Sequence, residues 1–135
     1  MAGTWAASQF YGVGKDLAAV AEKAMQIPGE AVRLRIHIGA NDTFGGRPLV
    51  DAIIDRAREQ GMAGATAWRG RAGFGESAHV HRIEQLAISH DLPVVIELVD
   101  DADKIAAFVP VVQSMLDTGL VTRESVTVLR YGVTQ

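Results

Sequence analysis

The order of its regular segments constrains this chain most, because two strand-helix units lie on either side of one long loop. Residues 33–38 alternate strictly between aliphatic side chains at even positions and Arg, Arg and His at odd positions. Such alternation is typical of a strand with one buried face. Gly39 ends this strand, Pro48 opens a segment with apolar residues at helical spacing, and Gly61 ends that segment. The first unit is therefore predicted to be a half-buried strand followed by an amphipathic helix.

A further strand follows this helix before the loop, and a second strand-helix-strand unit follows the loop. A short strand is predicted at about residues 65–70, and the strand at residues 94–99 is mostly apolar on both alternating sets. Acidic residues at 100, 101 and 103 open a second amphipathic helix, which Gly119 closes, and residues 125–131 alternate as a last strand. Pro110 falls inside this helix and predicts a kink or a restart near Val109, because proline removes a backbone hydrogen bond.

The resulting order is the split βαβ arrangement of a ferredoxin-like fold. We therefore expect an α+β sandwich, βαββαβ in order, with a four-stranded antiparallel sheet and two helices. The aliphatic residues at even positions of both central strands are expected to face the helices. Val95 and Val99 would then lie on the opposite face, so part of that face is expected to meet another subunit.

The composition narrows the class of protein. The 135 residues, 48% of them hydrophobic, suffice for one domain with its own core. We expect residues 31–135 to form that domain, and residues 1–30 to be an Ala- and Gly-rich extension, partly disordered, with a short helix at 16–26. A net charge of −3 argues against a nucleic-acid partner. The absence of cysteine and of a membrane-spanning apolar run favours a cytoplasmic protein.

The loop at residues 69–82 is the segment most suggestive of a binding site. Its glycines allow positive φ and a close approach to a ligand, and cationic or imidazole side chains surround them. The glycines are Gly70, Gly73 and Gly75, and the donors are Arg69, Arg71, Arg82, His79 and His81. The spacing matches neither a P-loop nor a Rossmann turn. The pattern fits an anion-cradling loop, and it fits a flexible surface loop equally well.

Several short motifs, spread along the chain in a fixed order, add a family resemblance. They are Leu34-Arg35-Ile36-His37-Ile38-Gly39, Gly46-Arg47-Pro48-Leu49, Gly61-Met62-Ala63-Gly64-Ala65-Thr66, Arg69-Gly70 with Gly73-Phe74-Gly75, Asp91-Leu92-Pro93-Val94-Val95-Ile96-Glu97, and Gly119-Leu120-Val121-Thr122. Together, over about residues 30–130, they resemble the domain-of-unknown-function 190 family. This resemblance implies a PII-like (GlnB-like) homotrimer of ferredoxin-like subunits, with a T-loop-like segment at about residues 71–85 and adenine nucleotides in the clefts between subunits.

The resemblance also implies the site residues. The Gly73-Phe74-Gly75 stretch is similar to the Gly-Phe-Gly at the start of the PII T-loop, so the nucleotide site is carried over to these residues and to Glu76 and Ser77. The PII phosphate-binding segment Gly-Asp-Gly-Lys has no counterpart at residues 121–125, which favours an AMP- or ADP-type ligand over a triphosphate. The candidate phosphate donors are Arg69, Arg71, Arg123 and Arg130, the first two ranking highest because they adjoin the loop.

Three functions remain open from the sequence. The first is a non-catalytic regulator that binds an adenine nucleotide and presents the T-loop-like segment to a protein partner, by analogy with PII proteins a membrane transporter or channel. The second is a small ferredoxin-like enzyme with acid-base groups among His37, His79, His81 and Arg82. The third is a divalent-metal-binding module at His79 and His81, whose i, i+2 spacing lets both rings reach one ion.

Overall fold

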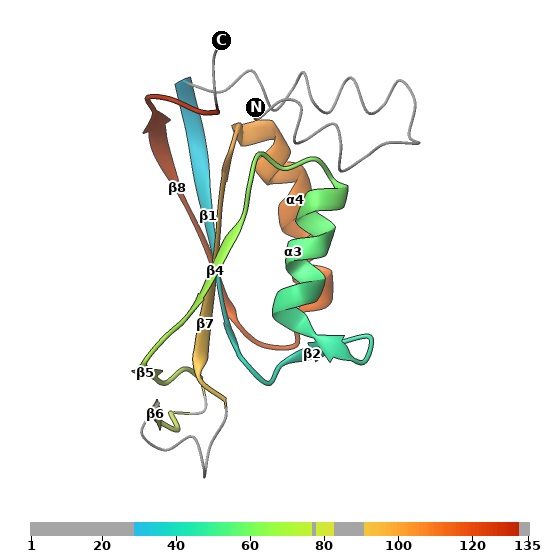
Figure 1. The fold of residues 1–135 in the computed structure, drawn as a ribbon, viewed down its shortest axis with the longest axis vertical. Coiled ribbons are helices and arrows are strands. Elements are labelled where there is room, and N and C mark those ends of the chain that lie inside the picture. Colours follow the sequence, from blue (N-terminus) through green and yellow to red (C-terminus); the bar gives the residue numbers. More distant parts are fainter. Residues whose placement is uncertain (1–28, 77, 83–90, 133–135) are drawn as a thin grey trace.

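A computed structural model describes residues 29–76, 78–82 and 91–132 (Figure 1). The elements follow the predicted order, with short strand pairs added in two loops. They are β1 (Gly29–Gly39), β2 (Thr43–Phe44), β3 (Arg47–Pro48), α3 (Leu49–Glu59), β4 (Thr66–Arg69), β5 (Ala72–Gly73), β6 (His81–Arg82), β7 (Pro93–Asp100), α4 (Ala102–Met115) and β8 (Leu120–Val128). The helix predicted at residues 16–26 lies outside the described residues.

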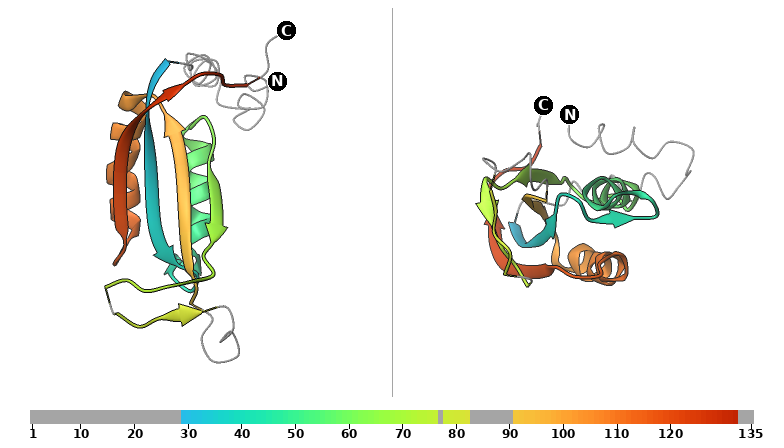
Figure 2. Two further views of the ribbon diagram at one scale, coloured as in Figure 1. Left: turned by 90° about the vertical axis from the view of Figure 1, so that its left-hand side faces the viewer. Right: turned by 90° about the horizontal axis from the view of Figure 1, so that it is seen from below.

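Four strands form the main sheet in the order β4-β7-β1-β8, and every neighbouring pair is antiparallel. Both helices cover one face of this sheet, and the other face is left open (Figures 1 and 2). The α+β ferredoxin-like sandwich expected from the sequence is therefore confirmed. β4 and β8 are the edge strands of this sheet. The chain leaves the sheet at the end of β4 and enters the loop at one end of the molecule (Figure 1).

The core lies between the sheet and the two helices, as the alternation of β1 and β7 predicts. The even-numbered aliphatic residues of both strands are buried, and α3 and α4 contribute residues one helical turn apart. Fully buried members are Leu34, Ile36, Ile53, Ile96, Leu98, Ile105, Phe108 and Val112. Burying a side chain of this size stabilises the fold by about 1.5–3 kcal/mol.

The helix ends show which signals the chain uses. Gly61, with φ +73°, follows the end of α3 in the left-handed conformation that glycine adopts without strain. At the start of α4, the Asp101 carboxylate accepts a hydrogen bond from the Lys104 amide at 2.9 Å. The restart predicted near Val109 is wrong, since α4 runs through Pro110 to Met115. Pro110 is exposed, and the helix is held on either side of it by buried core residues.

Two strands also differ from the prediction in their limits. β1 begins at Gly29, inside the segment assigned to the extension, and β8 runs from Leu120 to Val128 rather than over residues 125–131. Backbone pairing explains both, because β8 pairs with β1 over its whole length, from Leu120 opposite His37 to Val128 opposite Gly29. Side-chain alternation is blurred in β8, whose residues are mostly exposed at the sheet edge.

The open face of the sheet mixes ion pairs with apolar surface. Arg33 pairs with Glu124 at 2.5 Å, and Arg35 pairs with Glu97 at 3.0 Å. The register places apolar side chains beside these pairs on the same face, namely Trp68, Val95, Val99 and Leu120. Trp68 and Leu120 are 45% and 55% exposed, which is a large apolar exposure for a sheet face.

Candidate functional site

The loop after β4 is built on a short two-stranded ribbon rather than an irregular excursion. β5 and β6 pair antiparallel, with Ala72 opposite Arg82 and Gly73 opposite His81. We call residues 72–82 the ribbon. It extends beyond the end of the main sheet, next to the start of β7 (Figure 1). The sequence pattern did not predict it, because two-residue strands carry no detectable alternation.

We call residues 69–75 the ribbon base, and Pro93, the first residue of β7, supports it. The Gly70 amide donates to the Pro93 carbonyl at 2.6 Å. A Cβ on Gly70 would lie 2.7 Å from the Pro93 Cγ, and one on Gly73 would lie 3.1 Å from it. None of Gly70, Gly73 and Gly75 uses the positive φ that glycine allows. The backbone at Gly70 thus packs too closely on the proline ring for a Cβ, the backbone at Gly73 leaves only a tight fit, and a Cβ on Gly75 would meet open space.

The side chains around this base are strongly exposed. Phe74 is 70% exposed, an unusual position for a phenylalanine, and Arg69, Arg71, Glu76 and Arg82 are exposed as well. Ser77 lies outside the described residues. An exposed phenylalanine and exposed arginines thus lie within a few residues of one another in sequence, a combination that suits a ligand with an aromatic base and an anionic end.

Arg130 does not share this location within one chain. It follows β8 beyond the pair Gly29–Val128, whereas Arg69 pairs with Val94 and so lies level with Ile38. The stretch of β1 between Gly29 and Ile38 corresponds to about 30 Å at about 3.3 Å per residue. Arg123 lies between these levels, opposite Leu34. Only a second subunit could bring an Arg130 to a ribbon base.

The histidines do not form a recognisable catalytic or metal centre in the part of the chain that the structure describes. His37 is half-buried on the open face, between Val95 and Leu120 in the register, and His79 is exposed on the ribbon. No group of three or more His, Cys, Asp or Glu among the described residues is arranged to hold a metal ion. The side chain of His81 is not among those described, so the proposed His79–His81 pair stays a prediction.

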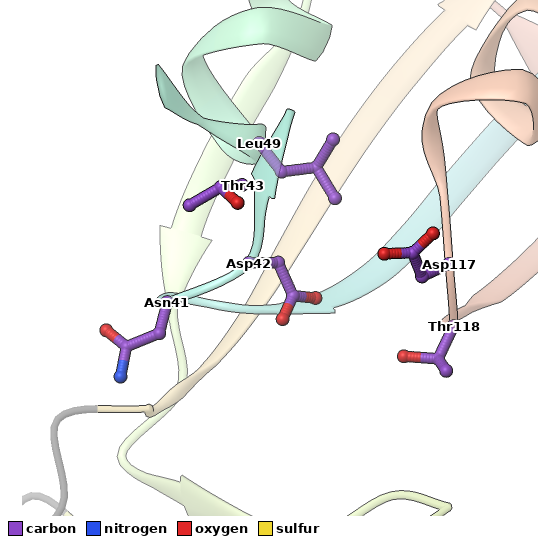
Figure 3. Close-up of a pocket in the computed structure, with 6 residues that line it drawn as sticks. All are labelled: Asn41, Asp42, Thr43, Leu49, Asp117 and Thr118. Carbon is purple, nitrogen blue, oxygen red and sulfur yellow. The ribbon is translucent and has the colours of Figure 1, made fainter. Parts of the chain in front are cut away.

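A pocket of about 250 Å³ lies between the loop after β1 and the turn after α4. It is lined by Asn41, Asp42, Thr43, Leu49, Asp117 and Thr118, and both carboxylates border the same space (Figure 3). Asp42 also accepts a hydrogen bond from the Gly39 amide at 3.0 Å. The sequence did not predict this pocket, because its two loops are far apart in the sequence and only the fold brings them together. Two carboxylates at its border disfavour a phosphate, which makes the ribbon base the better anion site.

No helix within residues 29–76, 78–82 and 91–132 is long and apolar enough to cross a bilayer. The sheet order and the two helices on one face together define an α+β fold of the ferredoxin-like class (Figure 1). Two solved structures have this fold, both of CPII, a nitrogen regulatory PII-like protein from Thiomonas intermedia K12. The one bound to ADP, AMP and bicarbonate superposes with a TM-score of 0.54 at 15% identity, over 75% of this chain and 90% of the other. The one bound to ADP and bicarbonate gives a TM-score of 0.51 at 17% identity, over the same shares of the two chains.

The chain belongs to the DUF190 family, described as "Uncharacterized ACR, COG1993", whose model matches residues 31–128. A UPF0166 protein of Aquifex aeolicus is 33% identical over 96 residues, which is 71% of this chain and 90% of the relative. A UPF0166 protein of Methanocaldococcus jannaschii is 31% identical over 77 residues, 57% of this chain and 70% of the relative. The family resemblance seen in the motifs is therefore confirmed.

Proposed function

We propose that this protein is a PII-like regulator that binds an AMP- or ADP-type nucleotide at the ribbon base, in a cleft between subunits. The observation that carries the proposal is the ribbon base itself, where Phe74 is 70% exposed beside a backbone fixed on Pro93. An adenine ring gains from stacking on an exposed aromatic side chain, and phosphate oxygens accept hydrogen bonds from backbone amides and guanidinium groups. The similarity of the fold to CPII structures bound to ADP and AMP supports this choice of ligand class.

A homotrimer would complete the site. The open sheet face carries Trp68, Val95, Val99 and Leu120, and contiguous exposed apolar surface often marks a site of contact between proteins. Contact between copies through this face would also bring together residues that lie at opposite ends of the sheet within one subunit. Arg130 of one subunit could then contribute to the ribbon base of its neighbour, together with the adjacent Arg69 and Arg71.

The hydrogen-bond donors near the ribbon base indicate how many phosphates the bound nucleotide carries. Arg69 and Arg71 adjoin it, and the turn after α4, which lies at the same end of the molecule, offers the Asp117 carboxylate instead of a lysine. Each further phosphate would bring more negative charge toward this acidic border. We therefore propose that AMP binds more tightly than ATP.

Regulation would operate through the ribbon. A nucleotide that contacts the ribbon base in only one ribbon conformation shifts the population toward that conformation, and so changes the affinity for a partner. The partner that we would test first is a membrane transporter or channel, reached from the cytoplasm. This mechanism needs no bond-making step, so the proposed protein is a regulator without catalysis.

Calorimetric titration of the full chain with AMP, ADP, ATP and Zn²⁺ tests the proposal. Phe74→Ala is the sharpest variant, because truncating a side chain that is 70% exposed leaves the core intact. We expect it to weaken AMP binding about tenfold at unchanged stability, since stacking contributes roughly 1–3 kcal/mol. Arg69→Ala should weaken AMP binding, and the matched control Arg58→Ala, on the exposed side of α3, should not.

The outcomes separate the three functions. AMP binding that is weakened about tenfold in Phe74→Ala and unchanged in Arg58→Ala supports the regulator. Zn²⁺ binding without nucleotide binding, abolished by His79→Ala, would replace it with the metal module. Turnover of the bound nucleotide, lost on substitution of His37 or His79, would replace it with an enzyme.

A further inference from the structure

The end of the molecule opposite the ribbon contains a fully buried carboxylate that the proposed site does not use. Asp100, the last residue of β7, has 0% exposure. Its carboxylate accepts hydrogen bonds from the Ala63 amide at 2.8 Å and from the Asp101 amide at 2.7 Å. Although Asp100 precedes the helix, it is thus a structural anchor for the segment before β4 rather than a helix-start charge. A buried charge persists only when such partners satisfy it.

A lysine completes this anchor from the first turn of α4. The Lys104 ammonium lies 3.2 Å from the Asp100 carboxylate and also donates a hydrogen bond to the Gly61 carbonyl. The lysine side chain is only 12% exposed, so the pair is largely shielded from solvent. β7 and α4 together therefore hold the turn that leads from α3 into β4.

The segment after β8 holds the same turn from the other side. The Tyr131 hydroxyl donates to the Ala63 carbonyl at 2.8 Å. Burial of the phenol, with the Asp100 charge nearby, raises the pKa of Tyr131, which keeps the hydroxyl protonated as a donor. The amide of Ala63 is bound by Asp100 and its carbonyl by Tyr131, so two side chains from distant parts of the chain grip one residue.

The hydrogen bonds that hold Ala63 have a counterpart near the ribbon, where a further hydrogen bond holds Gly70. We call residues 63–70 the edge segment, of which only Thr66–Arg69 pairs with β7 as a strand. At its far end, Gly70 donates to the Pro93 carbonyl at 2.6 Å. Pro93 and Asp100 are the first and last residues of β7, so one strand anchors both ends of the edge segment. A shift at Ala63 would therefore be carried along a short, four-residue pairing toward the ribbon base.

We propose that Tyr131 is a positioning residue: its hydrogen bond to Ala63 holds the edge segment in place. When the segment after β8 is released, this bond is lost and β4 becomes looser. The affinity of the ribbon base for its nucleotide then falls. This inference rests on the proposed function for its last step only. The clamp has two states, with Tyr131 docked or undocked, and one hydrogen bond with partial ring burial makes docking marginal. A partner that captured the segment carrying Tyr131 would thereby regulate the nucleotide site at the other end of the chain.

The test uses Tyr131→Phe, which removes only the hydroxyl, in a Trp5→Phe background where Trp68 on β4 is the single tryptophan. Ser114→Ala is the matched control. It also removes a hydroxyl that donates to a backbone carbonyl, that of Val111, but at an exposed position on α4. We expect amide exchange within residues 63–70 to rise about fivefold in Tyr131→Phe, the effect of one net hydrogen bond. Acrylamide should quench Trp68 more strongly, and the AMP dissociation constant should rise by up to the same factor.

Each result decides one part of the proposal. Exchange and Trp68 quenching that match the Ser114→Ala control overturn the clamp. Faster exchange with unchanged AMP affinity overturns its coupling to the site. If the unaltered chain binds no AMP, the proposed function fails, and the clamp is then decided by exchange and quenching alone. A second variant, Asp100→Asn, should raise exchange in the same residues, because it removes the charge that holds Lys104.

Discussion

The packing of the ribbon base on Pro93 predicts a graded response to alanine at three glycines. A Cβ on Gly70 would lie 2.7 Å from the Pro93 Cγ, closer than any ordinary contact, and the proline ring cannot rotate away. Overpacking of this kind costs roughly 1–3 kcal/mol. A Cβ on Gly73 would lie 3.1 Å from the same atom, so Gly73→Ala should cost less than Gly70→Ala.

Gly75 provides the internal control for this series. A Cβ there meets nothing within 4 Å, and its φ is not positive. Gly75→Ala should therefore leave the free energy of unfolding unchanged or raise it by about 0.4–1 kcal/mol, because alanine restricts the unfolded chain. Urea denaturation followed by circular dichroism, at one fixed protein concentration, measures all three variants.

A double-mutant cycle assigns the effect to the proline ring. Pro93→Ala removes Cγ, so Gly70→Ala should cost less in the Pro93→Ala background than in the unaltered chain, with a coupling of about 1 kcal/mol or more. Equal costs for Gly70→Ala and Gly75→Ala, or additive behaviour with Pro93→Ala, would refute the packing argument.

Two further predictions concern the other end of the molecule. Asp101→Ala removes the side chain that caps α4 and should lower the free energy of unfolding by about 1 kcal/mol. Asp103 is not the capping residue, so Asp103→Ala should lower it by less in the same urea assay. Because burial raises the pKa of Tyr131 above its ordinary value of 10.0, the unfolded chain loses this proton first as the pH rises. The contribution of Tyr131 to stability should therefore be complete below about pH 10 and decline above it, and Tyr131→Phe should show a shallower decline in this range. Identical slopes in the two proteins would contradict the buried setting of the phenol.

The fold was predictable because its signals are local and repeated. Alternation in residues 33–38 and helical spacing after Pro48 each follow from one buried face, and burial of that face is what the core requires. The limits of β8 were not predictable from side chains, because an exposed edge strand follows the backbone of its neighbour. Likewise, the restart near Val109 was wrong since core contacts on both sides of Pro110 outweigh one lost hydrogen bond.

The site was predictable only in part. The glycine loop was located by composition, but the reason for its glycines was not, because Pro93 approaches Gly70 and Gly73 from a strand that follows some twenty residues later in the sequence. Similarly, Asp100 reads as one of several acidic residues before a helix, and only the fold shows that it reaches Ala63. Contacts of this range are set by topology, which pattern reasoning supplies only as strand order.

Native mass spectrometry of the full chain with AMP tests the central claim most directly, since it reports subunit number and bound nucleotide in one spectrum. Three 14.4 kDa chains carrying up to three AMP molecules are expected, and Phe74→Ala should keep the trimer but need about tenfold more AMP for the same occupancy. A monomer, or a trimer that takes up no adenine nucleotide at concentrations well above those in cells, would contradict the account.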